Sequence, residues 1–541
     1  MAQAVTTVGS VPRGVGQEAT ASRGFTTEQW WIIITVIFGV FVSILDTTIV
    51  NTAIPKIQAI FGSSLHDAQY INTAYTLAQA VVVGASSFFA SRFGVKQTFL
   101  TSLGLFTLGS ALCGLAPSLT ILIFFRILQG AGGAALFPLG IALIFSSVSQ
   151  RQRGLVNGVF GIPVLFAPAI GPTLGGFIVQ YVDWRWIFYV NVPIGILGVL
   201  IGVRYLPGRP GNPAVRFDAR SFVPLAGGLG LLLYGLTNLA SDGWSSISSV
   251  SGPTIAGSLL LIVFVVVSLT SKAPLLDLRV FANRTFLIGN IIIALATVGL
   301  FGAQFLLPQY LQNLRGLDPL HSGLQLLPLG LAAMVATVFA GALFNRVGPG
   351  VLMIFGAALL TIDTYLLANW IGAPNSAYAA LPILLILRGL SLPPLAQTSN
   401  TVALRDIQGQ ALNSASTLIV VTRLVVASFA LAIFTNILIT QEVAHAASLA
   451  SQATRANPVT LGMISSLTRR FEAQGLSAAQ ATSAALGQMY RQVSLNATVL
   501  AFRDVFLVSA AITIPAILLS FVFLRSRPAA PSGAERPAVG E

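Results

Sequence analysis

The sequence is poor in charge, in cysteine and in histidine, and each shortage removes a class of function. Only 8% of the 541 residues are charged, whereas about a quarter is usual in soluble globular chains. The single cysteine, Cys113, excludes an intrachain disulfide, and the three histidines are far apart in sequence, so no metalloenzyme is indicated. The net charge of +13 is scattered between apolar segments and forms no basic helix that would bind nucleic acid. We therefore expect no nucleic-acid partner, no metal and no cofactor.

What the sequence has in abundance is long apolar runs. Hydrophobic residues make up 55% of the chain, and the mean hydropathy is +0.83. Crossing a bilayer takes roughly 20 apolar residues, and runs of about that length recur fourteen times between residues 31 and 525. An even number of spans places both termini on one side. The short loops expected on the opposite side hold only Lys56, Arg185 and Arg315, so the positive-inside rule predicts cytoplasmic termini.

These runs predict an all-α membrane protein with two six-helix halves. Two extra central helices would separate the halves, and a long outward loop would interrupt the second half. The expected parts are a tail (1–28), the N-terminal half (29–206), the extra helices (207–272), the C-terminal half (273–525) with its loop (441–502), and a second tail (526–541).

The loop at 441–502 has helical character. Apolar residues recur at three- and four-residue spacing from Leu461 to Phe471, and Ser477 with Gln480 forms a capping-box pattern. We expect two or three short amphipathic helices here. The loop is either a solvated spacer or a docking element for a partner, because an apolar stripe on an exposed helix needs a surface to cover it.

Four stretches carry a family resemblance. They are "LDTTIVNTAIPKI" (Leu45–Ile57), "RILQGAGGAA" (Arg126–Ala135), "GPTLGG" (Gly171–Gly176) and "WRWIFYVNVPIG" (Trp184–Gly195). Together they resemble the fourteen-span drug:proton antiporters of the Emr/Qac type, in the major facilitator superfamily. The resemblance implies a major facilitator fold in a bacterial inner membrane, a small-molecule substrate exchanged for protons, and a role in antibiotic resistance. In Gram-negative cells, similar permeases work with a periplasmic adaptor, or membrane fusion protein, and an outer-membrane channel.

Two motifs depart from the family pattern. In the loop between the second and third spans, Arg92, Gly94 and Lys96 match the family's gating motif, but Ser91 replaces the usual aspartate, which puts the charge relay of that loop in doubt. In the fifth span, Ala167 stands where another glycine is usual. The resemblance assigns the antiporter motif of that span to Gly158, Gly171, Pro172, Gly175 and Gly176, although small residues also serve close helix packing.

Five ionisable residues lie inside the apolar runs, and each must face a cavity or a partner because burial in hydrocarbon costs at least ~2.5 kcal/mol. They are Asp46, Arg126, Asp363, Arg388 and Arg423. At 1.5 Å per residue, Asp46 and Arg126 both fall roughly 10 Å below the outer face, so they could meet. Desolvation favours a neutral acid and a guanidinium favours the carboxylate, so a change of access would change proton affinity. Asp46 is thus the expected coupling acid and Arg126 its modulator, with a permanent structural ion pair as the alternative.

The remaining three residues are a possible second ionisable site in the C-terminal half. Asp363 is either a second protonation site or a polar group bonded to a neighbouring helix. Arg388 precedes "GLSLPP", a stretch that predicts a distorted helix and a structural role. Arg423 is expected in the bundle interior, paired with a residue that the sequence does not identify.

A substrate cavity for lipophilic compounds should be large, apolar and aromatic, with few fixed polar groups. Ordinary helix packing explains each single candidate equally well. The candidates are Gln129, Asn290, Phe301, Gln304, Phe305, Gln309 and Tyr310.

The leading hypothesis is a proton-driven exporter of drugs or other lipophilic toxic molecules. Export of an endogenous metabolite, lipid or siderophore by the same mechanism is the alternative. A membrane-embedded enzyme would need clustered His, Cys and carboxylate residues, which the sequence lacks.

Overall fold

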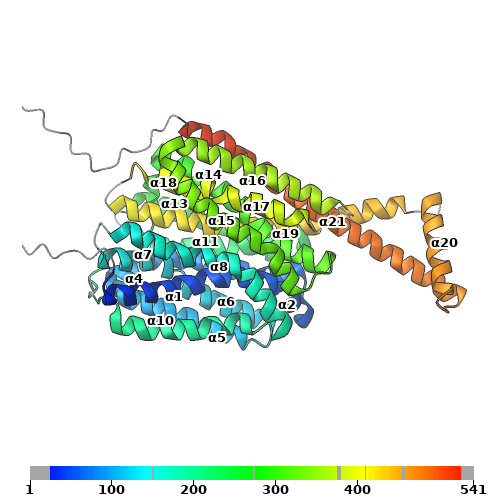
Figure 1. Cartoon of the computed structure of the whole chain (residues 1–541), viewed down its shortest axis with the longest axis horizontal. Coiled ribbons are helices and arrows are strands. Elements are labelled where there is room, and N and C mark those ends of the chain that lie inside the picture. Colours follow the sequence, from blue (N-terminus) through cyan, green and yellow to red (C-terminus); the bar gives the residue numbers. More distant parts are fainter. Residues whose placement is uncertain are drawn as a thin grey trace, which may run out of the picture.

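The computed structural model describes residues 25–148, 152–208, 210–271, 274–373, 379–407, 410–453 and 457–524. Every regular element in this part of the chain is a helix, and the long helices run side by side in one elongated bundle (Figure 1). Twelve of the described helical segments are long and apolar enough to cross a membrane. The prediction of an all-α, multi-pass membrane protein is therefore confirmed.

The N-terminal half packs around α1 (Thr27–Ile49), which contacts α7, α8 and α10. A capping box starts α1: the Thr26 side chain accepts from the Gln29 backbone, and the Gln29 side chain accepts from the Thr26 backbone. The other elements of this half are α2 (Ile54–Phe61), α3 (Leu65–Ala68), α4 (Tyr70–Phe93), α5 (Val95–Gly114), α6 (Leu119–Gly133), α7 (Leu136–Ser147), α8 (Arg153–Tyr181), α9 (Trp186–Tyr189) and α10 (Asn191–Tyr205).

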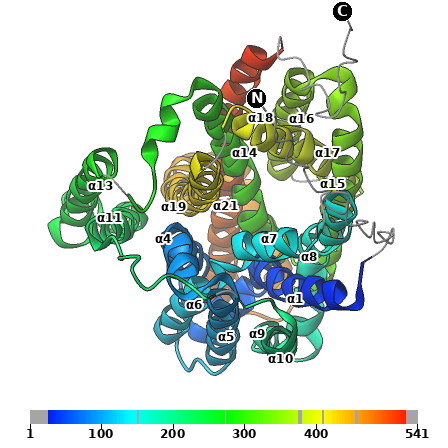
Figure 2. The ribbon, with the colours of Figure 1, turned by 90° about the vertical axis from the view of Figure 1, so that its left-hand side faces the viewer.

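The extra helices are central in chain order but peripheral in space. Helices α11 (Ala219–Thr237) and α13 (Gly252–Thr270) pack on each other at the edge of the bundle, beside α4 and α19 (Figure 2). The short α12 (Leu239–Asp242) lies between them in sequence. The side chain of Asn436 in α19 donates to the Leu236 carbonyl and accepts from the Ala240 backbone, at 2.5 and 2.6 Å, which ties this pair to the C-terminal half.

The C-terminal half repeats the arrangement with longer helices. As predicted from "GLSLPP", its fourth span is distorted, because a π-helical turn at Pro393–Gln397 separates α17 from α18. The helices of this half are α14 (Arg284–Gln309), α15 (Pro319–Val347), α16 (Pro349–Gly372), α17 (Ala380–Leu392), α18 (Thr398–Leu404), α19 (Gln410–Gln452), α20 (Pro458–Glu472) and α21 (Ala478–Ser520).

A helical hairpin projects from one end of the bundle (Figure 1). Helices α19 and α21 are each 43 residues long, or about 65 Å, against about 30 Å of hydrocarbon. The prediction of short helices between residues 441 and 502 was wrong in this respect: the two spanning helices continue outward, and only α20 is a separate short helix among the described residues there. The reason is that the segment 441–452 contains neither glycine nor proline, so α19 continues as a helix beyond the end of its apolar run. The capping box of Ser477 and Gln480 is confirmed at the start of α21.

The hairpin end of the bundle is also where the two halves are joined. One apolar cluster there includes Trp184 and Phe188 from the first half and Tyr310 and Phe502 from the second. The first and last described residues lie at the opposite end (Figure 1).

Candidate functional site

Asp46 lies in α1 with no exposed surface. The hydroxyl groups of Thr47 and Thr48 donate to carbonyls one turn earlier, at 2.6 and 3.0 Å. Such bonds compete with the regular helix, and α1 gives way to a 3₁₀ turn at Val50–Thr52. The acid therefore sits one turn before an irregular stretch of the helix.

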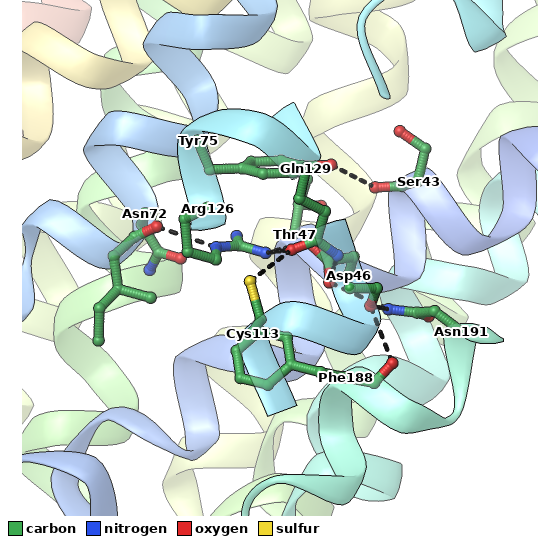
Figure 3. A network of polar contacts seen from close by, with 12 residues as sticks. Ser43, Asp46, Thr47, Asn72, Tyr75, Cys113, Arg126, Gln129, Phe188 and Asn191 are labelled. Atoms are coloured by element: carbon green, nitrogen blue, oxygen red, sulfur yellow. Dashed lines mark hydrogen bonds and ion pairs between the residues drawn. The ribbon is translucent and has the colours of Figure 1, made fainter. Parts of the chain in front are cut away.

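Arg126 of α6 meets Asp46 (Figure 3). Its Nη1 donates to Asp46 Oδ2 at 2.5 Å, and both side chains are fully buried. Its Nε donates to the Ile71 carbonyl of α4 at 3.1 Å, and its guanidinium carbon lies 4.0 Å from the Tyr75 ring centroid. The structure thus brings together the two residues whose depths along their helices indicated a meeting, and it adds α4 to the site.

Two amides complete the shell of the carboxylate. Gln129 Nε2 donates to Asp46 Oδ1 at 2.8 Å, and Gln129 Oε1 accepts from Arg126 at 2.7 Å. Asn191 Nδ2 donates to the same Asp46 oxygen at 3.1 Å and contacts Ser110 Oγ (Figure 3). Sequence reasoning missed Asn191, although a lone buried amide in the apolar "YVNVPIG" was a usable signal. Three side-chain donors, from Arg126, Gln129 and Asn191, therefore meet one buried carboxylate.

The C-terminal half holds a second buried ion pair. Arg388 Nε donates to Asp363 Oδ2 at 2.8 Å, and both side chains are fully buried. The same guanidinium donates to the Gly299 carbonyl and to Thr364 Oγ1, at 2.9 and 2.8 Å. In both halves, then, the arginine of the fourth span is held by a carboxylate and a backbone carbonyl from other helices.

Arg423 does not belong to that pair. Its side chain is exposed and lines a cavity of about 160 Å³, and no carboxylate among the described residues forms an ion pair with it. The expectation that Arg423 is paired in the bundle interior is therefore not met in the part of the chain that the structure describes.

The residues of the antiporter motif lie where helices approach closely. A side chain on Gly171 would stand 2.1 Å from Thr48 Oγ1 of α1, and one on Gly176 would stand 2.2 Å from the Pro319 carbonyl of α15. Gly175 packs on α1 as Gly171 does, and the Pro172 carbonyl lies against Gly323 of α15. The side-chain surroundings of Gly158 lie outside the described residues. The motif thus links the helix that carries Asp46 to the opposite half.

The loop with Ser91 is held by α10 and by the segment that follows it. Arg92 Nη1 donates to the carbonyls of Pro213 and Val215, each at 2.6 Å, and Lys96 donates to the Val203 carbonyl at 2.9 Å. Gly94 adopts a positive φ of 90°, which a residue with a side chain rarely adopts. Backbone carbonyls of α10 and of the segment that leads to the extra helices therefore accept hydrogen bonds from Lys96 and Arg92.

Three of the seven cavity candidates line pockets between the halves. Phe301, Gln304 and Phe305 line a pocket of about 50 Å³, which Tyr75 and Gln79 also line. The remaining four do not line the three pockets described here, since each packs or bonds elsewhere: Gln129 on Asp46, Asn290 on Thr422, Gln309 on Asn313 and Tyr310 on the Ile371 carbonyl.

The polar bonds between the two halves gather at the hairpin end. Among the described residues these bonds are Gln312 to the Thr52 carbonyl, Thr173 to the Gly323 carbonyl, and the Leu320 backbone to Gln180. Together with the contact of Gly176 and Pro319, they close this end of the bundle.

Comparison with known proteins places this architecture in a family. The sequence pattern of the Major Facilitator Superfamily matches residues 36–431. The chain is 30% identical over 91% of its length, and 92% of the relative, to an uncharacterized MFS-type transporter, YhcA, of Bacillus subtilis. It is 32% identical to a multidrug resistance protein B homolog of Mycobacterium tuberculosis, with 75% of each chain covered. It is 31% identical to the putative multidrug resistance protein MdtD of Escherichia coli, with 73% of this chain and 82% of MdtD covered.

Solved structures agree at the level of the fold. The inward-facing, unoccupied structure of a bacterial homolog of the human lysosomal transporter Spinster superposes with a TM-score of 0.60 at 15% identity, covering 94% of this chain and all of that one. A D-xylose–proton symporter gives a TM-score of 0.54 at 15% identity, covering 75% and 90%.

The helical halves, the buried ion pairs and these matches define a multi-pass membrane transporter rather than an enzyme. The chain belongs to the major facilitator superfamily.

Proposed function

We propose that the chain is a proton-driven exporter of drugs or other lipophilic molecules, of the fourteen-span type, in a bacterial inner membrane. Helices α5 and α8, of 20 and 29 residues, supply the two spans beyond the twelve already counted. The hairpin faces outward and both termini are cytoplasmic, since Arg92 and Lys96 lie in a loop at the end opposite the hairpin. Relatives named for multidrug resistance support the substrate class.

The observation that carries the proposal is the environment of Asp46. The acid is fully buried, yet the Tyr75 ring that covers Arg126 also lines a pocket between the halves. Tyr75 is therefore the wall that separates the ion pair from the cavity. A shift of α4 against α6 would open Asp46 to the cavity and separate Arg126 from the Ile71 carbonyl and the Tyr75 ring, and both changes alter the surroundings of the acid.

Protonation leaves the guanidinium with partners. When Asp46 takes up a proton, Arg126 still donates to Gln129 Oε1 and to the Ile71 carbonyl. The proton enters from the outside and leaves to the cytoplasm, while the substrate moves the other way. One proton moving down 100 mV supplies ~2.3 kcal/mol, which supports a concentration ratio of about fifty.

Asp363 serves as the comparison because its buried pair resembles that of Asp46. Helix α16, which carries Asp363, contributes no residue to the three pockets, whereas α1 contributes Thr47 and Thr48. We therefore assign the Asp363 pair to structure and the Asp46 pair to coupling.

The test is transport in proteoliposomes with an imposed pH gradient. Asp46→Asn keeps an acceptor for Arg126 but cannot release a proton, so we expect drug uptake driven by the gradient to fall at least a hundredfold. Exchange of labelled for unlabelled substrate, which needs no net proton movement, should persist. Asp363→Asn, reconstituted at equal density, should retain gradient-driven transport, although with lower thermal stability. Wild-type rates for Asp46→Asn would exclude Asp46 as the coupling acid.

We further propose that the hairpin contacts a periplasmic adaptor that leads to an outer-membrane channel. The apolar stripe of α20 is partly covered by α21, where Ala481 and Ala485 are fully buried, so the stripe alone does not require a partner. Val459 and Tyr490, however, remain 77% and 78% exposed on the projecting part.

Shortening the hairpin tests this contact. Replacing residues 449–497 with a Gly-Ser linker keeps the base of the hairpin, where His445 bonds Asp504 at 2.7 Å and Glu442 accepts from Thr498. We expect the shortened chain to insert normally but to lose co-purification of an adaptor from its native membranes. Val459→Ser with Tyr490→Ser is the milder variant, and full adaptor recovery with the shortened chain would refute the contact.

A further inference from the structure

The cavity around Arg423 has an unusual charge balance. Three pockets lie among the helices of the bundle, and their linings share residues: the first and third share Phe301, the first and second share Leu300, and the second and third share Gln304. No aspartate or glutamate lines any of the three, because Asp46 and Asp363 are buried behind their own arginines. Arg423 is the one formal charge in these linings.

The surroundings of Arg423 do not neutralise it. Among the described residues, its side chain has no carboxylate within ion-pair distance and no hydrogen-bond partner. The hydroxyls of Thr297 and Thr337 in the same lining donate to carbonyls of their own helices, at 2.7 and 2.8 Å. An unpaired guanidinium in the membrane interior is costly unless water or an anion meets it. A cavity of about 160 Å³ has room for water or for an anionic group beside the guanidinium.

Other side chains of the lining can assist an anion. Gln397 and Asn400 line the same cavity as Arg423, so two amide groups are available there besides the guanidinium. The rest of the wall is apolar, with Ile293, Leu300 and Phe301 prominent. A guanidinium binds a carboxylate through two parallel N–H donors, a geometry that a lysine cannot provide.

We propose that this cavity binds the anionic head of an amphipathic substrate, with the carboxylate or a similar oxyanion on Arg423 and the apolar body along Phe301. The body then points toward the pocket that Tyr75 lines, so the substrate approaches the wall in front of Asp46. The inference names a substrate class for the proposed exporter, but the binding preference itself does not depend on proton coupling.

The test compares two probes that share one apolar body. Purified full-length protein in nanodiscs is titrated with 1-pyrenebutanoate and with its trimethylammonium counterpart, without any ion gradient, and empty nanodiscs correct for partition into lipid. We expect the wild-type protein to bind the carboxylate at least tenfold more tightly than the ammonium probe. Equal affinity, or preference for the ammonium probe, would overturn the proposal whether or not any variant folds.

Variants test whether Arg423 is the source of the preference for the carboxylate probe. Arg423→Gln should weaken carboxylate binding at least tenfold and leave ammonium binding unchanged, while Arg423→Lys should retain part of the preference through its charge. The control is Arg405→Gln, which removes an arginine that pairs with Asp406 outside the cavity and should change neither affinity. Equal weakening of both probes by Arg423→Gln would indicate packing rather than charge recognition, and would count against the proposal.

The same titration separates this inference from proton coupling. Asp46→Asn should keep the charge preference at equilibrium even though it loses gradient-driven transport. If the wild-type protein prefers the carboxylate probe but shows no proton-driven transport, the anion site stands and only the proposed exporter is refuted. The opposite result, normal coupling without a preference, would refute only the anion site.

Discussion

At the scale of residues, the site is a buried carboxylate whose charge state depends on its neighbours. Asp46 accepts from Arg126, Gln129 and Asn191, which come from two helices other than its own. Each hydrogen bond to a charged group contributes roughly 1.5–3 kcal/mol. Because α6 supplies two donors and α10 the third, a relative movement of helices changes how strongly the ionised form is stabilised.

Asn191 is a positioning residue, and its removal tests this dependence. Asn191→Leu keeps the number and branching of the side-chain heavy atoms but deletes one hydrogen-bond donor to Asp46. We expect the pH profile of transport to change, because the surroundings of the proposed coupling acid have changed. Transport by reconstituted protein across pH 5–9 measures the change.

The matched control is Asn290→Leu, which removes a buried amide that bonds Thr422 rather than the acid. It should leave the pH profile in place, and Asn191→Gln should restore part of the wild-type profile. A fall in rate with an unchanged profile in Asn191→Leu would mean that Asn191 is structural.

At the scale of elements, the contact between the halves depends on the end of a helix. The start of α15 shows this, since the side chain of Asp318 accepts from the His321 backbone at 2.8 Å just where Pro319 meets Gly176 of α8. This hydrogen bond, from an N–H to the carboxylate, lowers the pKa of Asp318. The N-cap of α15 therefore helps to fix the contact between the halves.

The cap makes a pH-dependent prediction. Asp318→Ala should lower the free energy of unfolding by about 1 kcal/mol at pH 7. A depressed folded-state pKa gives stability that is present above the unfolded value of ~3.9 and is lost as pH falls through the folded value. Denaturant unfolding in detergent should therefore show a smaller difference between wild type and Asp318→Ala at pH 3 than at pH 7.

Asp318→Asn is the conservative control, because an asparagine also caps a helix well. It should stay within a few tenths of a kcal/mol of wild type at pH 7 and should lose the pH dependence. An Asp318→Ala difference of equal size at both pH values would contradict the cap.

At the scale of the whole molecule, closure at the hairpin end depends on a close backbone contact between α8 and α15. Gly176 and Pro319 meet so closely that any larger residue at 176 would overlap the Pro319 carbonyl. Around this contact lie the hydrogen bonds that join the halves, including Thr173 to the Gly323 carbonyl. The conformation closed at this end thus needs glycine at one position on α8.

Gly176→Leu should therefore favour the opposite conformation. We expect normal insertion, at least a tenfold loss of transport, and faster labelling of a cysteine placed at Gln304, in the cavity, by an impermeant maleimide added on the hairpin side. The native Cys113 is buried and should not interfere. Gly230→Leu is the control, since nothing lies within 4 Å of a side chain there, and unchanged labelling in Gly176→Leu would contradict the closure.

The sequence by itself determined the class of protein and one pair of helices that could meet. Apolar runs fix which segments enter a bilayer, and depth along a helix follows from 1.5 Å per residue, so Asp46 and Arg126 could be matched in advance. The same local reasoning predicted the distorted fourth span of the second half, because paired prolines inside a helix remove backbone hydrogen bonds.

Only the tertiary structure decided the partners. That Asn191 bonds Asp46, that Arg388 pairs with Asp363, and that Arg423 stands alone in a cavity all depend on how helices distant in sequence rotate and pack. The length of the hairpin was missed for a related reason: hydropathy marks where a membrane ends, whereas a helix ends where its backbone loses support, and in α19 these two points differ.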